Sequence, residues 1–186
     1  DLGNTVLFSS LIFGSVIHLF SKKALRDINY IQNYFAATEI DCIKIVPSYW
    51  KSLEIGGRLL SPARMIIFGG EELPTEIVRQ INLENPALRI INHYGPTETT
   101  IGKLLHEVDL NYNYNKIPIG KAFSNTQLYV VDKNLSLCAA GITGELLIGG
   151  DGVSSGYLNN PELSEQKFVD NIFQNDSGKL YRTGDL

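Results

Sequence analysis

The first hundred residues mix helical and strand-like patterns of apolar positions. Residues 4–13 form an apolar run that Gly14 ends, which predicts a short buried helix. Residues 15–20 predict a strand. From 23 to 38 the apolar residues recur at three- and four-residue spacing, which predicts a surface helix that covers one face of a sheet.

Three more apolar runs predict the strands of that sheet: residues 42–46, 65–68 and 88–91. Residues 74–85, between the last two runs, predict a helix with Pro74 in its first turn. Strands that alternate with helices favour an α/β fold with a parallel sheet flanked by helices. Since ligands bind at the carboxyl ends of parallel strands, the loops that follow these runs should converge on one crevice.

The pattern becomes β-rich after about Thr100. Four apolar runs separated by turns predict a meander or small barrel: residues 103–108, 127–132, 145–150 and 179–183. The sequence therefore predicts two subdomains, an α/β part over 1–103 and a β-rich part over 104–186.

Composition excludes some classes of function. The 186 residues are 44% apolar with a net charge of -4, which is typical of a globular protein, and no basic stripe indicates nucleic acid as a partner. The apolar N-terminal run is shorter than the roughly 20 residues that span a bilayer, and no basic segment precedes it, so neither a membrane anchor nor a signal peptide is expected. Cys42 and Cys138 are expected to be reduced core thiols of a cytoplasmic protein.

The first candidate for chemistry is NHYGPTETT, residues 92–100, which follows a predicted strand. One interpretation is a turn in which a threonine caps a helix. The other is a nucleotide site, in which the Tyr94 ring stacks a base and the turn at Gly95 lets a ligand approach the backbone. A threonine hydroxyl would then contact phosphate and Glu98 would hold Mg²⁺ beside it. The stretch alone leaves both open.

Three other stretches are ambiguous when each is taken alone. The Gly69-Gly70 pair in IFGGEEL removes side chains from the end of a strand, where a flat ring could lie. The glycines of GELLIGGDGVSSGYLNNPELSEQKF, residues 144–168, match neither G-x-G-x-x-G nor G-K-[ST], which favours a structural turn. In YRTGDL a turn leaves Asp185 able to accept two hydroxyl hydrogen bonds, as an acid does for a ribose.

Together and in this order, NHYGPTETT, the segment 144–168 and LYRTGDL resemble core motifs of the adenylation domains of nonribosomal peptide synthetases, within the adenylate-forming superfamily. The resemblance extends across essentially the whole chain. It implies that ATP and an amino acid give an aminoacyl adenylate and pyrophosphate, and that the acyl group then passes to the phosphopantetheine thiol of a peptidyl carrier domain. It also implies Mg²⁺ with the ATP and a condensation domain in the same assembly line.

The resemblance implies roles for individual residues around the base. Tyr94 would stack on adenine, Asn92 would hydrogen-bond its amino edge, and the backbone of Gly69, Gly70 and Glu71 would line it.

Around the phosphates, Thr97 and Glu98 would be the catalytic residues, with Glu98 also the Mg²⁺ ligand, and Asp185 would hold the ribose hydroxyls. Two family elements, the Ser/Thr/Gly-rich phosphate loop and the C-terminal lid domain with its catalytic lysine, are expected to lie outside these 186 residues. Because such groups stabilise the transition state, the isolated chain is expected not to adenylate.

The family selects its amino acid with pocket positions, which fall here on Asp1, Leu2, Thr5, Lys44, Ile67, Gly69, His93, Gly95, Ile101 and Gly102. Asp1 would pair with the α-ammonium of the substrate, which favours an amino acid.

Lys44 and His93 favour an acidic substrate side chain. A lysine in a strand is usually exposed or snorkels, but the run that contains Lys44 leads to the crevice, and His93 ends a neighbouring strand. Cationic or donor groups in a closed pocket are costly unless a ligand anion pairs with them. The set is similar to that of aspartate-activating domains, so L-aspartate is expected, with asparagine or a substituted aspartate as alternatives.

Two other functions stay open. An acyl- or aryl-CoA synthetase shares the nucleotide motifs but needs no acid at Asp1. A non-catalytic nucleotide-binding module would keep the fold without the reaction, although the presence of Glu98 and Asp185 argues against it.

Overall fold

The computed structural model describes residues 3–174 and 178–186, and the chain divides into two compact units. The first unit comprises residues 1–94 and 105–120, and the second comprises 95–104 and 121–186. The division is discontinuous, whereas the sequence pattern led us to expect a single boundary after residue 103. The reason is that residues 105–120 return to the first unit after the chain has left it.

The first sheet contains the expected parallel strands. Its order is β1 (Cys42–Ile45), β2 (Met65–Gly69), β3 (Arg89–Tyr94), β4 (Leu104–Glu107) and β5 (Lys121–Ala122). The pairs β1–β2 and β2–β3 are parallel, which confirms the α/β prediction. The prediction that residues 103–108 belong to the β-rich part is wrong for residues 105–108, which belong to the first unit, and β4 is a neighbour of β3 in this sheet.

The helices of the first unit are α1 (Asn4–Phe13), η1 (Ala24–Arg26), α2 (Ile28–Ala37), α3 (Pro47–Ser52) and α4 (Thr75–Glu84). α1 is confirmed as a helix, and Gly14 ends it in the left-handed conformation at φ 68°. The expected burial of this helix is wrong, because none of its residues is buried and Leu11, Ile12 and Phe13 are exposed. The single helix expected over 23–38 is interrupted, because Asp27 takes an extended conformation and caps α2 by accepting a hydrogen bond from the Tyr30 N–H at 3.0 Å. The strand expected over 15–20 is wrong, since that segment is coil.

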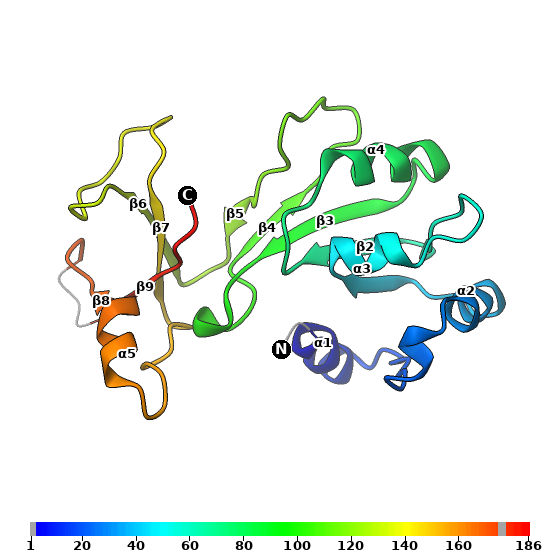
Figure 1. Ribbon diagram of the computed structural model, residues 1–186, viewed down its shortest axis with the longest axis horizontal. Helices are drawn as coiled ribbons and strands as arrows, with labels where there is room; N and C mark the ends of the chain where they lie inside the picture. The colour runs from blue at the N-terminus through cyan, green and yellow to red at the C-terminus, as the bar shows by residue number, and fades with distance from the viewer. Residues whose placement is uncertain (1–2, 175–177) are drawn as a thin grey trace. The chain divides into compact units, whose positions relative to one another are not determined.

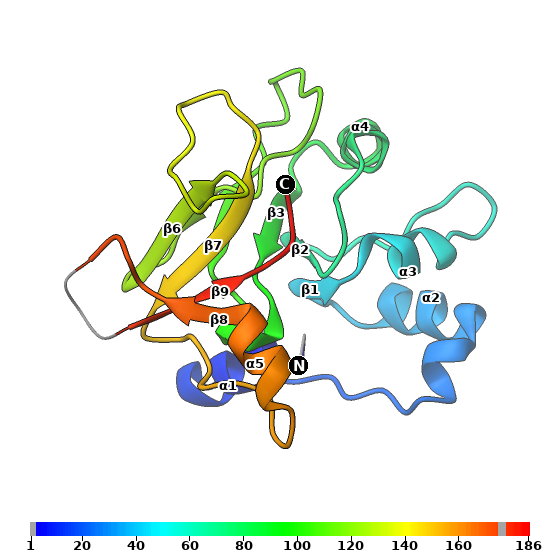
Figure 2. The same cartoon turned by 60° about the vertical axis from the view of Figure 1, so that its left-hand side comes forward.

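α4 and α1 lie on opposite sides of strands β1 to β3 in both views (Figure 1 and Figure 2). Ile77, Val78 and Ile81 of α4 join Phe68 of β2 in the main core of the first unit. α3 adds Trp50, which is 1% exposed, crosses the Phe68 ring edge-on and donates from Nε1 to the Leu60 carbonyl at 2.8 Å. One face of the sheet is thus filled by packing, and the side where α1 lies carries the polar residues described below.

The second unit contains an antiparallel sheet in the order β6 (Thr126–Val131), β7 (Glu145–Gly150), β9 (Lys179–Arg182) and β8 (Phe168–Asp170). β9 lies between β7 and β8, so the sheet is neither a simple meander nor a barrel. Val131, Leu147 and Leu180 form its core. Helix α5 (Pro161–Lys167) lies beside β8 and β9 (Figure 2).

Cys42 and Cys138 are free cysteines, but their expected core positions are wrong. Cys42 is exposed and Cys138 is half-buried, because Cys42 begins the outermost strand of the first sheet and Cys138 lies in the loop between β6 and β7. Among the described residues, the structure has no helix that combines the length and the apolar character needed to cross a membrane.

Candidate active site

The register of the parallel strands places four of the expected pocket residues on one face of the sheet. Lys44 pairs with Ile67, and Gly69 pairs with His93. Successive residues of a strand point to opposite faces, so positions 67 and 69 share a face, and their partners share it with them. Four positions that are far apart in the sequence are therefore brought together by strand pairing.

α1 contacts Lys44 through a fifth expected residue. The Nζ of Lys44 donates a hydrogen bond to the Oγ1 of Thr5 at 2.6 Å. Burial lowers the pKa of Lys44 to about 8, and burial together with the charge of Lys44 lowers the pKa of His93 to about 4. At pH 7 this cluster therefore contains an ammonium group beside a neutral imidazole, which offers a hydrogen bond rather than a second charge.

Asn92 and Tyr94 alternate with His93 along β3 and so lie on the other face of the strand. Asn92 is 5% exposed, and its Nδ2 donates to the carbonyl of Pro118 at 2.9 Å. This bond orients the carboxamide and leaves its oxygen the role of acceptor. The residues expected around adenine and those expected around the amino acid thus separate onto two faces of one strand.

The conformation of the loop after β2 depends on Gly70 and on hydrogen bonds to Glu71. Gly70 has a φ of 83°, in the region that favours glycine, and a Cβ there would lie 3.3 Å from the Cγ1 of Val46. The carboxylate of Glu71 accepts from the N–H of Ser48 at 2.9 Å and from its Oγ at 2.6 Å. The side chain of Glu71 therefore holds the loop against the start of α3.

In the second unit, a tight turn carries the expected phosphate and metal residues. Thr97 and Glu98 lie in η2 (Thr97–Thr99), a single 3₁₀ turn. A Cβ on Gly95 would lie 2.0 Å from the carbonyl oxygen of Ile101, so only glycine fits there. Ile101 has a φ of 64°, which is rare for a β-branched residue. The turn is therefore closed by packing of its own backbone.

Helix capping by a threonine, the other interpretation of NHYGPTETT, does not occur in this turn. The N-cap residue of η2 is Pro96, and no side chain caps the turn. The Oγ1 of Thr99 instead donates to the carbonyl of Pro96 at 3.1 Å, and Thr99 is 0% exposed. Gly102, another expected pocket residue, donates its N–H to the carbonyl of Thr100 at 2.8 Å.

Glu98 is held by a phenol that the sequence did not single out. The hydroxyl of Tyr157 donates to the Oε1 of Glu98 at 2.7 Å, and the hydroxyl of Tyr181 lies 3.5 Å from that of Tyr157. Burial acts to raise the pKa of Glu98, but the hydrogen bond from Tyr157 and the charge of Lys167 help to outweigh it, so the pKa lies below its usual value. Glu98 is therefore ionised at neutral pH. The only sequence signal for Tyr157 was its place in the segment 144–168.

The donor set around Glu98 fits a metal ion that arrives with phosphate. Among the described residues, no group of three or more histidine, cysteine, aspartate and glutamate side chains could hold a metal. Mg²⁺ is commonly bound by one or two carboxylates together with substrate phosphates. A carboxylate also accepts several bonds, so the contact of Glu98 with Tyr157 is compatible with metal ligation.

Three expected site residues lie at the ends of the chain. Asp185 follows β9, where its carbonyl accepts from the N–H of Leu146 at 2.9 Å and its N–H donates to the Oγ1 of Thr183 at 3.0 Å. Hydrogen bonds therefore fix both the N–H and the carbonyl of Asp185. Asp1 and Leu2 lie outside the described residues.

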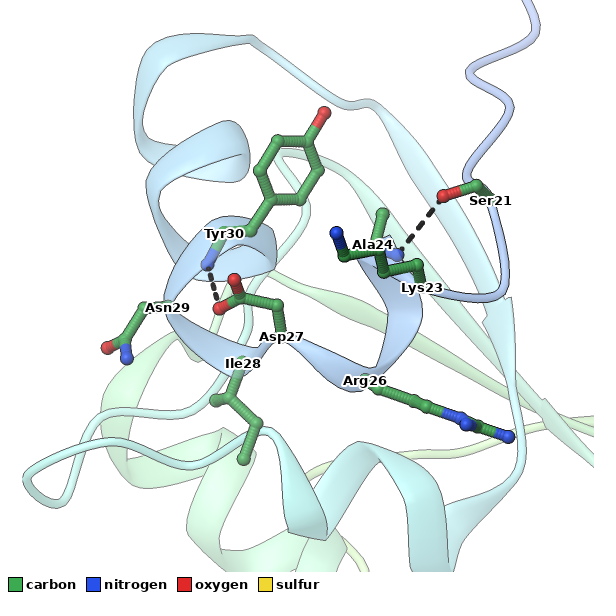
Figure 3. Close-up of a pocket in the computed structure, with 8 residues that line it drawn as sticks. All are labelled: Ser21, Lys23, Ala24, Arg26, Asp27, Ile28, Asn29 and Tyr30. Carbon is green, nitrogen blue, oxygen red and sulfur yellow. Dashed lines mark hydrogen bonds between the residues drawn. The ribbon is translucent and has the colours of Figure 1, made fainter.

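A large hollow of about 760 Å³ lies elsewhere, around η1 and the start of α2 (Figure 3). Two of its polar groups serve local structure: the Oγ of Ser21 accepts from the Ala24 N–H at 3.1 Å, and Asp27 caps α2. None of the expected site residues lines it. It therefore plays no part in the site.

Comparison with known proteins identifies the family and the fold. Residues 1–158 match the family model described as AMP-binding enzyme. The chain belongs to this family. Tyrocidine synthase 3 of Brevibacillus parabrevis is 38% identical to this chain, over 100% of the chain and 3% of its own length. Bacitracin synthase 3 of Bacillus licheniformis is 37% identical, over 100% of the chain and 3% of its own length.

Solved structures agree with these relatives. A four-domain nonribosomal peptide synthetase bound to AMP and glycine has a TM-score of 0.76 at 33% identity, over 92% of this chain and 13% of that one. A protein containing adenylation and PCP domains has a TM-score of 0.74 at 29% identity, over 85% of this chain and 28% of that one. The resemblance to adenylation domains of nonribosomal peptide synthetases is confirmed. The chain spans only a small part of the length of the relatives it matches.

Proposed function

We propose that this chain is part of an amino-acid adenylating ligase of nonribosomal peptide synthesis, and that its substrate is L-aspartate. A carboxylate oxygen of the amino acid attacks the α-phosphorus of ATP, a carboxyl–phosphate bond forms, and pyrophosphate leaves. The thiol of a carrier-domain phosphopantetheine then takes the acyl group and AMP leaves. The adenylation and PCP domains named for a solved neighbour support the carrier domain as partner.

The contact of Lys44 with Thr5, beside His93, is the observation that carries the substrate assignment. Burial makes the ammonium of Lys44 less stable than in water. A β-carboxylate in hydrogen-bonding range of Lys44 would offset that cost, and the neutral imidazole of His93 would donate a further hydrogen bond. A neutral amide would leave the ammonium without a counter-charge. Because Lys44 is only half-buried, we take about 2 kcal/mol, the low end for such pairs, or roughly 30-fold in specificity.

The nucleotide would lie at the carboxyl ends of β2 and β3, beyond the packed part of the sheet. The carboxamide oxygen of Asn92 would accept from the adenine amino group, Tyr94 would stack on the ring, and the backbone of residues 69–71 would line it. Asp185 would accept hydrogen bonds from the ribose hydroxyls.

At the phosphates, the hydroxyl of Thr97 would donate to an oxygen, and Glu98 would hold Mg²⁺ beside it. When bound, Mg²⁺ would neutralise charge that develops on the phosphates. At the amino acid, the carboxylate of Asp1 would pair with the α-ammonium group.

The test is amino-acid-dependent pyrophosphate exchange by the complete protein that carries this chain, run across the proteinogenic amino acids. We expect L-aspartate to give the highest rate. Lys44→Met should lower kcat/KM for aspartate roughly 30-fold and lower that for asparagine much less. The matched control is Lys116→Met, since the side chain of Lys116 is 85% exposed. A preference for a hydrophobic amino acid, or full aspartate activity in Lys44→Met, would refute the substrate; activity with fatty or aryl acids alone would refute the ligase class.

A further inference from the structure

The segment that follows β7 encloses the turn that carries Glu98. The N–H of Ser154 donates to the carbonyl of Glu98 at 2.8 Å, and the Oγ1 of Thr100 donates to the carbonyl of Gly152 at 2.8 Å. The hydroxyl of Tyr157 completes the enclosure by donating to the Oε1 of Glu98 at 2.7 Å. Both the backbone and the carboxylate of Glu98 are therefore held by one segment, residues 152–157.

Both the backbone and the ring of Tyr157 are held by neighbouring residues. The Oγ of Ser164 in α5 accepts from the Tyr157 N–H at 2.8 Å. The Tyr157 ring meets the ring of Phe168 edge-on, with centroids 5.4 Å apart, and Phe168 in turn contacts the ring of Tyr181 at 5.2 Å. A ring fixed in this way presents its hydroxyl from one direction, so the carboxylate that accepts from it loses rotational freedom.

We propose that Tyr157 is a positioning residue for Glu98, which orients the carboxylate so that Glu98 presents its remaining lone pairs to the metal of a metal–nucleotide complex. This inference rests on the proposed function, because it assumes that Glu98 is the Mg²⁺ ligand. Metal ligands are usually held by outer hydrogen bonds of this kind, and their loss typically lowers metal affinity by tenfold or more. The glycine-rich segment 144–168 thereby has a role at the site. It contacts the turn that carries Thr97 and Glu98, and is not proposed to bind phosphate itself.

A hydrogen bond to a carboxylate can also act in the opposite direction. By withdrawing electron density it makes the oxygen a poorer metal ligand, so removal of the phenol would tighten Mg²⁺ if orientation were unimportant. The two effects differ in sign, and this makes the proposal testable. Positioning predicts weaker Mg²⁺ binding in Tyr157→Phe, and an electronic effect alone predicts stronger binding.

The experiment measures ATP binding by calorimetry over a series of Mg²⁺ concentrations, with the complete protein that carries this chain. In Tyr157→Phe we expect the half-saturating Mg²⁺ concentration to rise roughly tenfold, with full ATP binding restored by excess Mg²⁺. Tyr129→Phe is the matched control, because Tyr129 lies in β6 and stacks on Phe173. It should bind Mg²⁺ as the wild type does.

A double-mutant cycle separates positioning from a general structural effect. In the Glu98→Gln background, Tyr157→Phe should change the Mg²⁺ dependence no further, because the phenol acts through the carboxylate. If Tyr157→Phe does not fold, Ser164→Ala, which loosens the Tyr157 backbone, should give a smaller rise of the same sign.

The outcomes are distinguishable. If Glu98→Gln leaves Mg²⁺-dependent ATP binding of the protein unchanged, the proposed role of Glu98 fails. If Glu98→Gln weakens it but Tyr157→Phe has no effect or tightens it, the proposed function stands and the positioning role of Tyr157 is overturned.

Discussion

The acid sensitivity of the first unit should depend on His93 and, through it, on Lys44. The pKa of His93 is lowered to about 4, first by burial and second by the charge of Lys44. In the unfolded chain the same imidazole has its ordinary pKa of about 6.5. Between pH 6.5 and 4 the unfolded state therefore binds more protons than the folded state, and the free energy of unfolding falls as the pH falls.

The magnitude follows from the two pKa values. The difference between about 4 and about 6.5 corresponds to about 3 kcal/mol, and screening by solvent around the half-buried Lys44 reduces this to about 2 kcal/mol. His93→Gln should abolish this loss. Lys44→Met should reduce it by less than half, because burial is the larger cause and remains in that variant.

The assay is urea unfolding at a series of pH values from 7 to 4, followed by fluorescence of Trp50. Trp50 is the single tryptophan of the chain and is 1% exposed in the core of the first unit, so its emission reports on that unit. His106→Gln is the matched control: burial lowers the pKa of His106 too, but this variant keeps the pair of Lys44 and His93.

Two results would refute the reasoning. The first is a His93→Gln variant that loses stability between pH 6.5 and 4 as steeply as the wild type. The second is a Lys44→Met effect of equal size in the wild-type and His93→Gln backgrounds, which would show that the charge of Lys44 does not act on His93.

Two further predictions concern stability, each measured by thermal unfolding with circular dichroism. Gly95→Ala should lower the stability of the second unit by about 2–4 kcal/mol, since its Cβ would lie 2.0 Å from the Ile101 carbonyl oxygen; Gly3→Ala, with nothing within 4 Å of its Cβ, is the control, and equal effects of the two would contradict the geometry. Trp50→Phe should cost about 2–4 kcal/mol, because it removes the hydrogen bond to the Leu60 carbonyl and leaves a cavity; a loss below about 0.5 kcal/mol would show that this contact does not stabilise the core.

Local patterns predicted the elements that depend on neighbouring residues. The run at 65–68 and the helix around 75–84 follow from apolar periodicity, and Gly14 ended α1 because glycine adopts the left-handed conformation readily. The helix predicted over 23–38 is divided at Asp27 in the structure. The side chain of Asp27 accepts a hydrogen bond from a backbone N–H of the next turn, which ends one helical segment and begins another.

Elements that depend on distant partners were predicted less well. Residues 15–20 have a strand-like composition but form coil, since composition alone does not supply a neighbouring strand. β4 was expected in the second unit because it is apolar and short, yet its neighbour in the sheet is β3. Such pairings bring together residues that are remote in the chain, and local periodicity carries no information about them.

By itself, the sequence determined the family and the chemical types of the candidate site residues, because its motifs retain their order and their spacing along the chain. Only the tertiary structure decided which of those groups are buried and which hydrogen bonds they make. Lys44 meets Thr5 across 39 positions, and Tyr157 meets Glu98 across 59. Burial and hydrogen-bond geometry are set where remote segments pack, so the ionisation of His93 and the orientation of Glu98 became visible only in the fold.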